Sequence, residues 1–125
     1  MKRRADLHRA TVGGRLLVDR LRAAHTHWTR LRGLLGTRTL APGEGLWIKP
    51  SNQVHMLGMR YAIDVVFLDD AGRVLRVVHE LRPNRISPKV TGATSVLELP
   101  AGTVARLGVE PDATVVIEAI AARAA

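Results

Sequence analysis

Five side chains in the central and later parts of the chain have the chemistry that a binding cleft needs. If strands bring them together, an imidazole, a cation and acidic groups would surround a space suited to a small polar ligand or a peptide carboxylate. Structural roles are the alternative, in which the acids pair with Arg60 or Arg32 and the methionine belongs to the core. The five side chains are those of His55, Met59, Arg60, Asp64 and Glu98.

The sequence contains few residues that could form a site for covalent catalysis or for metal binding. The chain has no cysteine, which excludes a thiolate nucleophile and any cysteine-ligated metal. His25 and His27 have no acidic neighbour at ligand spacing, and no glycine-rich phosphate loop precedes a helix. An enzyme using His55, Asp64 and Glu98 would need a water-excluding pocket that joins all three. We therefore expect no metal, no cofactor and a non-enzymatic domain. The serines, none in a nucleophile-elbow context, are Ser51, Ser87 and Ser95.

Positive charge is concentrated at the beginning of the chain. The net charge is +8, and residues 1–38 contain ten Lys or Arg against two Asp, whereas residues 39–125 contain nine of each sign. Clustered cations attract nucleic acid and other polyanions, so an anion-binding surface is one hypothesis. Exposed tryptophan rings would add stacking, although Trp28 and Trp47 are most simply packing residues. The candidate anion-binding residues are Arg20, Arg22, Arg30 and Arg32.

Length and composition predict one domain with an aliphatic core. The chain has 125 residues, of which 46% are hydrophobic and only 3% aromatic. The basic first residues are followed by no apolar stretch of the kind a signal peptide has, and no run is long enough to span a membrane as a helix. A cytoplasmic location is the expectation. We predict a basic arm over 1–14, a globular domain over 15–120 and a frayed tail over 121–125.

The clearest local pattern is a β-hairpin. Two valine-rich segments, Ile63–Leu68 and Val74–Leu81, flank a short connection that contains Gly72. In the second segment, the side that includes Leu75 is the better core candidate. An irregular loop is expected over Arg82–Gly92, which contains two prolines. Other predicted elements are strands at Gly45–Lys49, Gln53–Leu57, Ser95–Leu99 and Thr114–Ile120, and one or two helical turns over Gly102–Leu107 that end at Gly108.

The stretch from Arg15 to Leu35 has two interpretations. Apolar residues at helical spacing from position 17 to position 35 would suit one long amphipathic helix. A strand over Arg15–Ala23, followed by a short helix that begins near Thr26 and ends at Gly36, fits the same residues.

Several motifs in one order give the chain a resemblance to a known family. They are Arg32-Gly33-Leu34-Leu35-Gly36, Gly43-Glu44-Gly45-Leu46-Trp47, the segment from Val54 to Asp69, and Leu97-Glu98-Leu99-Pro100-Ala101-Gly102. Together they resemble the uncharacterised ACR family, also known as domain-of-unknown-function family 192, a widespread bacterial family whose biochemical role is unassigned. The five cleft candidates lie at family-like positions.

The resemblance implies a compact, mostly β domain with a short helix, and it favours the strand-then-helix interpretation. Met56 and Ala62 depart from the family pattern and weaken any polar role there, while Asp112 stands in the final turn where members often have glycine before aspartate. We expect an α+β, mainly β fold: an antiparallel, partly closed, barrel-like sheet of about seven strands with one or two short helices. The expected function is a binding or accessory module for an unidentified ligand or protein partner.

Overall fold

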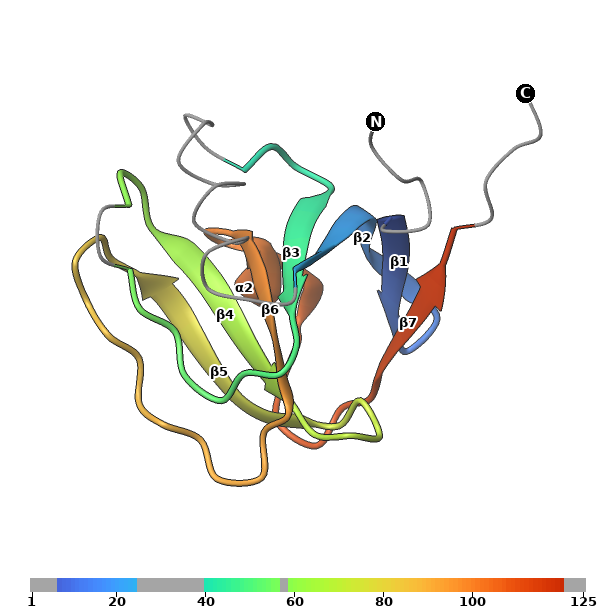
Figure 1. Cartoon of the computed structure of the whole chain (residues 1–125). Coiled ribbons are helices and arrows are strands. Elements are labelled where there is room, and N and C mark those ends of the chain that lie inside the picture. Colours follow the sequence, from blue (N-terminus) through green and yellow to red (C-terminus); the bar gives the residue numbers. More distant parts are fainter. Residues whose placement is uncertain (1–6, 25–39, 57–58, 121–125) are drawn as a thin grey trace.

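Seven strands and one short helix form the parts of the chain that the computed structural model describes, residues 7–24, 40–56 and 59–120 (Figure 1). The predicted helix after Thr26 lies outside these residues, as do Arg30 and Arg32. The elements are β1 (Leu7–Val12), β2 (Arg15–Ala24), β3 (Glu44–Ile48), β4 (Ile63–Leu68), β5 (Val74–Leu81), β6 (Ser95–Pro100), α2 (Thr103–Leu107) and β7 (Val115–Ala119).

Most of the locally predicted elements are confirmed. The hairpin formed by β4 and β5 has the predicted bounds, and β2 is a strand, which excludes one long helix from Leu17. Residues 82–94 contain no named strand. The helix α2 ends at Gly108, whose left-handed φ of 68° allows its N–H to bond the carbonyl of Val104.

The strands form one sheet in the order β5-β4-β6-β3-β2-β1-β7. All neighbouring pairs are antiparallel except β2 and β3, which are parallel, so the prediction of a wholly antiparallel sheet is wrong. Parallel neighbours need a long crossover connection, and residues 25–43 supply one between these two strands.

Two further predictions need correction. Leu7–Val12 is a strand rather than part of a loose arm, and Gly13 and Gly14, both at positive φ, form a two-residue hairpin turn that pairs it with β2. No strand occupies Gln53–Met56, where His55 makes only an isolated bridge with Ile86. The strand β1 is unexpected and the expected strand near Gln53 does not form, so the number of strands in the described residues still agrees with the predicted seven.

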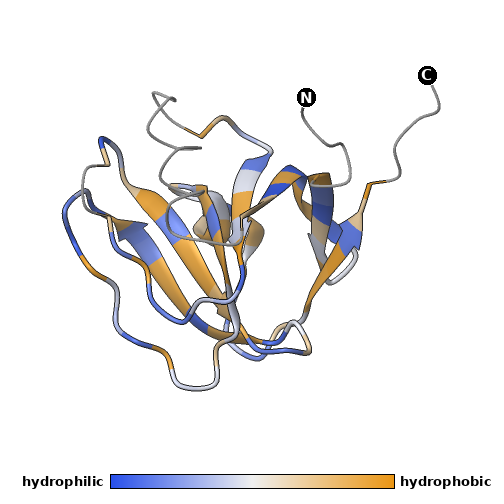
Figure 2. Cartoon of the chain, viewed as in Figure 1, coloured by the Kyte–Doolittle hydropathy of each residue, from blue (hydrophilic) through white to orange (hydrophobic). Residues whose placement is uncertain are grey.

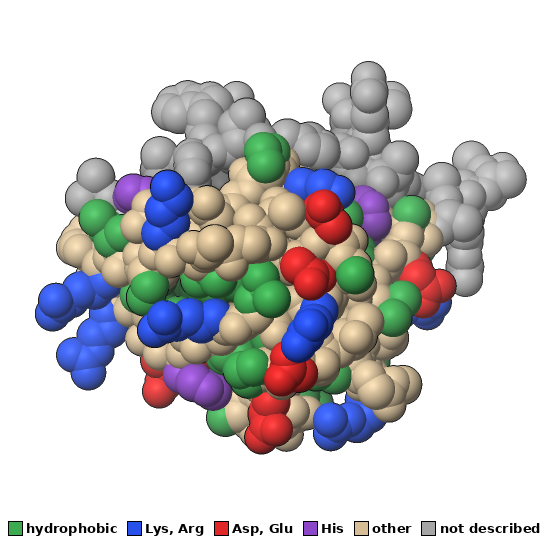
Figure 3. Space-filling model, turned by 90° about the horizontal axis from the view of Figure 1, so that it is seen from below, with side chains coloured by type: hydrophobic (Ala, Val, Ile, Leu, Met, Phe, Trp, Pro, Cys, Tyr) green, Lys and Arg blue, Asp and Glu red, His purple; other side chains and the backbone are tan. Residues whose placement is uncertain are grey.

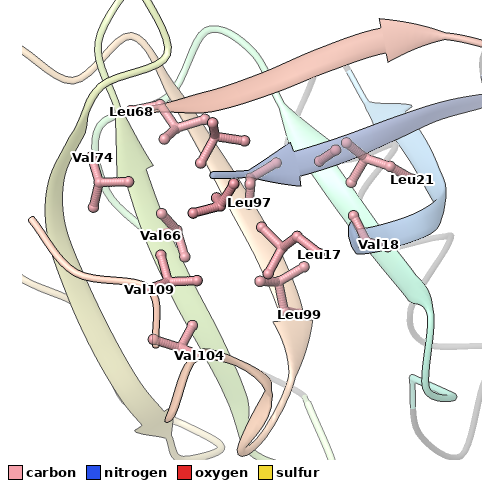
Figure 4. Close-up of a cluster of buried hydrophobic side chains, with 13 residues drawn as sticks. Leu17, Val18, Leu21, Val66, Leu68, Val74, Leu97, Leu99, Val104 and Val109 are labelled. Atoms are coloured by element: carbon pink, nitrogen blue, oxygen red, sulfur yellow. The ribbon is translucent and has the colours of Figure 1, made fainter. Parts of the chain in front are cut away.

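The strands β4 and β6 consist mostly of hydrophobic residues (Figure 2), and they are buried on both faces. Every residue of β4 is buried, and side chains alternate between two cores. Val66 and Leu68 point into the concave core, where Leu97 and Leu99 of β6 join them (Figure 4). Val65 and Phe67 belong to the convex core on the opposite face.

The strand β5 also contributes to both cores. Val74 is fully buried in the concave core, and Leu75 packs against the convex core. Two register shifts in the pairing of β4 with β5 break the simple alternation, so residues from both sides of β5, the Leu75 side included, reach a core.

The helix α2 fills the concave side of the curled sheet. Val104 of α2 and Val109 just after it lie beside Val66 and Leu99 in the concave core (Figure 4). Because the strands curve around these aliphatic side chains, the sheet is a half-barrel with a helical plug rather than a flat layer.

The two edge strands meet at one end of the half-barrel. Val115 donates its N–H to the carbonyl of Gly72 at 2.8 Å, and Arg73 forms an isolated bridge with Thr114. The guanidinium of Arg73 also pairs with Asp112, which raises the pKa of the arginine. Asp112 has a φ of 74°, so it takes the turn position predicted for it in place of glycine. Figure 1 shows the β4–β5 hairpin beside the segment leading into β7.

We expect Gly72→Ala to destabilise the domain by more than Gly92→Ala. Both glycines have positive φ, but a Cβ at Gly72 would collide with the carbonyl oxygen of Val115, whereas at Gly92 the nearest atom is 3.5 Å away. Backbone strain alone costs about 1–3 kcal/mol. Urea unfolding measures both free energies, and equal values would contradict the role of this closure.

Candidate functional site

The five predicted cleft residues do not share one cleft. Asp64 pairs in register with Leu99, and Glu98 with Val65, so the two acids lie on opposite faces of the sheet. Both are fully buried. Met59 is buried in the convex core, and the remaining two, His55 and Arg60, are exposed.

Asp64 has a structural role. Its Oδ1 accepts the backbone N–H of Glu80 and its Oδ2 accepts that of Val104, each at 2.9 Å. The second bond satisfies a donor at the start of α2, and the first holds Glu80 at its positive φ of 49°. The carboxylate thus joins β4 to β5 and to the helix. Its partners are backbone amides rather than the arginines that the structural alternative proposed.

A pocket that joins His55, Asp64 and Glu98 is therefore not formed, which removes the geometry that the enzyme alternative required. In the described ranges, no group of three or more His, Cys, Asp or Glu is arranged to hold a metal ion. No helix in these ranges is long and apolar enough to cross a membrane.

The predicted anion-binding residues fall into two groups. Arg20 and Arg22 are exposed on β2, whereas Arg30 and Arg32 lie outside the described residues. Arg20 already donates from Nη2 to the carbonyl of Pro42 at 2.9 Å, and its Nε lies 3.6 Å from Asp19 Oδ1. Figure 3 shows acidic and basic side chains intermixed on the lower face. The charged side chains on that face are therefore not all of one sign.

A pocket of about 320 Å³ lies on the concave side, between β3 and β7 and next to the β4–β5 hairpin. The two strands are three places apart in the sheet and face each other only because the sheet curls. None of the five predicted cleft residues lines it. The lining residues are Trp47, Lys49, Leu68, Asp69, Asp70, Ala71, Gly72, Thr94, Ser95, Thr114, Val115, Val116 and Ile117.

Trp47 provides the main apolar wall. The His8 and Trp47 rings form a T-shaped pair with centroids 5.4 Å apart and planes at 73°, and Lys49 Nζ lies 5.7 Å from the Trp47 ring centroid. The tryptophan thus contacts a ring of β1 and the cation of the residue that directly follows β3. Its buried Nε1 has no hydrogen-bond partner within the described structure.

The hairpin provides the acidic rim. Asp69 Oδ1 accepts the backbone N–H groups of Ala71 and Arg73, both at 2.9 Å, which fixes the turn. Asp70 next to it is exposed. The pocket lining therefore includes two carboxylates and the ammonium group of Lys49, together with the hydroxyl-bearing side chains of Thr94, Ser95 and Thr114.

Two partial signals for this site lie in the amino-acid sequence. Trp47 followed by a lysine at a strand end, and paired aspartates in a hairpin turn, are both visible in the chain. What no local pattern shows is that the curl places β7 opposite them. The packing role expected for Trp47 is present, since the ring packs against the concave core, and Trp47 also lines the pocket.

These observations define a class: small, mainly β half-barrel domains with a helical plug and an open pocket between non-adjacent strands. The chain belongs to the family described as Uncharacterized ACR, domain of unknown function 192, whose model matches residues 8–117. The resemblance found in the motifs is thereby confirmed. No curated protein matches the chain.

Two solved structures share the fold. One is a protein of unknown function from Novosphingobium aromaticivorans, with a TM-score of 0.75 and 24% identity, covering 88% of this chain and 83% of that one. The other is a proposed transcription regulator from Sinorhizobium meliloti, with a TM-score of 0.74 and 24% identity, covering 93% and 97%. At this identity the likeness shows the fold and assigns no activity.

We expect Asp64→Ala to lower the free energy of unfolding by about 3 kcal/mol, because the buried N–H of Val104 and the part-buried N–H of Glu80 lose their acceptor. Asp70→Ala removes an exposed side chain and should stay within about 0.5 kcal/mol of the parent. Urea unfolding provides the comparison. An Asp64→Ala protein as stable as Asp70→Ala would show that this carboxylate does not join the strands to the helix.

Proposed function

We propose that the domain is a non-enzymatic binding module and that the pocket between β3 and β7 is its ligand site. The observation behind this proposal is the lining, which combines an aromatic wall, aliphatic side chains, an ammonium group and two carboxylates around about 320 Å³. Ligand pockets in proteins have this mixture of apolar walls and few polar groups, and volumes from roughly 300 Å³ upward.

The lining also favours a class of ligand. An indole face and the side chains of Leu68 and Ile117 suit an apolar or planar group, while charges of both signs at the rim suit polar ends. A small molecule with an apolar body and charged or hydrogen-bonding ends, or a few residues of a peptide, matches both features. Either ligand fits the accessory-domain expectation from the sequence.

Binding without catalysis is the simpler role for this lining. Its titratable side chains are Lys49, Asp69 and Asp70, and one oxygen of Asp69 already accepts two backbone bonds in the turn. Ser95 and the threonines have no histidine among the lining residues to act as their base.

A single-tryptophan protein tests the proposal. Trp28→Phe leaves Trp47 as the one tryptophan, so emission reports on the pocket wall. We expect saturable changes with at least one class in a panel of amino acids, dipeptides, nucleosides and monosaccharides. Lys49→Ala should then weaken binding about tenfold or more, which corresponds to the loss of one charge-assisted contact.

Lys89→Ala is the matched control, because Lys89 is exposed and lies outside the pocket lining. A panel with no saturable response, or equal loss in both lysine variants, would contradict the pocket as the site.

Nucleic-acid binding is the second candidate, supported by the basic excess in residues 1–38. The described residues contribute little to it, since they contain twelve Lys or Arg and ten Asp or Glu. A gel-shift titration of the full chain with random-sequence DNA separates the two proposals. Affinity that falls by orders of magnitude between about 50 and 200 mM salt would favour the polyanion candidate.

A further inference from the structure

We infer that the open edge of β7 binds the amino end of an extended polypeptide, which pairs with β7 as an added parallel strand and places its first residues in the pocket. The inference rests on the proposed function and names the ligand class of the same site. It follows from the direction of the backbone groups of β7, the place where that edge ends and the charges beside it.

The backbone groups of β7 alternate between two sides. Ile120 donates its N–H to Leu7 of β1, whereas Val115 donates in the opposite direction, to Gly72. Since N–H and C=O of one strand residue point to the same side, Ile117 and Ala119 direct theirs to the edge away from β1. No other described strand pairs with this edge beyond Thr114.

This edge is better suited to an added strand than the other edge of the sheet. The pairing of β7 with β1 runs without a register shift, while the pairing of β5 with β4 has two. Bulges are one way in which sheets discourage added strands, and β7 has none. Val116 is 50% exposed, and neither Pro nor Lys occurs in β7.

The pocket is continuous with this edge and closed at one end. Val115, Val116 and Ile117 line it, so a strand added to β7 would lie along the pocket and direct alternate side chains toward Trp47. The bridge of Arg73 with Thr114 already occupies the edge at the start of β7. A peptide on this edge must therefore begin or end at that point.

The charges that line the pocket favour the amino end of the peptide over its carboxyl end at this closure. Asp69 and Asp70 belong to the hairpin that closes this end, Lys49 also lines the pocket, and Arg73 is paired with Asp112. The rim thus has one more carboxylate than ammonium groups, which favours a cation there. A chain with its amino end at the closure runs in the same direction as β7, because β7 starts there.

The test uses heptapeptides with free amino ends, selected from a randomised display library against the full chain and then synthesised. We expect acetylation of the amino end to weaken binding at least tenfold and amidation of the carboxyl end to change it little. Binding should also weaken as the pH rises past about 8, where an α-amino group loses its charge. In ¹⁵N spectra, the amide signals of Ile117 and Ala119 should shift.

Ala119→Pro and Ala119→Val separate edge pairing from other contacts. The proline removes a donor that faces the open edge, and Ala119 is exposed, so the pairing of β7 with β1 keeps its bonds. We expect at least a tenfold loss with proline and little change with valine. N-methylation of alternate peptide residues tests the same bonds without changing the protein.

Each outcome decides between the inference and its rivals. The inference fails if amidation of the carboxyl end weakens peptide binding and acetylation of the amino end does not. It also fails if binding is unchanged both in a folded Ala119→Pro protein and with N-methylated peptides. Failure to select any peptide would overturn it as well. If small ligands still change Trp47 emission and depend on Lys49, the proposed pocket stands while the peptide inference fails.

Discussion

The shape of this domain depends on a short contact between segments far apart in the chain, where Val115 bonds Gly72 and Arg73 meets Thr114. A twisted sheet of seven strands has two edges, and the bonds found in the described part of the chain hold them together at one end. Joining them keeps the sheet curled around the side chains of α2, so the concave core is enclosed. Leaving them apart beyond that point produces the pocket. Gly72 permits the contact because any side chain there would collide with Val115.

Local physics accounts for the parts of the fold that the sequence predicted. The β4–β5 hairpin, the loop after Arg82, the cap at Gly108 and the turn at Asp112 each depend on residues close together in the chain, whose backbone preferences dominate. The parallel pairing of β2 with β3 depends instead on where residues 25–43 return the chain. The strand β1 was missed because its inward-facing Ala10 and Val12 alternate with polar residues in a segment dominated by its charge.

The candidate site was harder to predict, for two physical reasons. The side to which a strand residue points changes with every position, so Asp64 and Glu98, both plausible acids, lie on opposite faces once the register is fixed. The pocket itself combines two strands that are not neighbours, and only the curl makes them neighbours in space. Chemistry inferred from residue types alone therefore identified one acid that holds the fold together, and it missed Trp47, Lys49 and the aspartates of the hairpin.

The hairpin from Asp69 to Gly72 serves two purposes, since it closes the sheet and lines the pocket with carboxylates. Its geometry leaves little freedom for change, because Asp69 must accept two amides and Gly72 must lack a side chain. Lys49 and Thr94 also line the pocket, and neither forms the bonds between Gly72 and Val115 or between Arg73 and Thr114 that close the sheet. Substitutions at these two positions can therefore alter which ligand binds without opening the closure, whereas substitutions in the hairpin alter both.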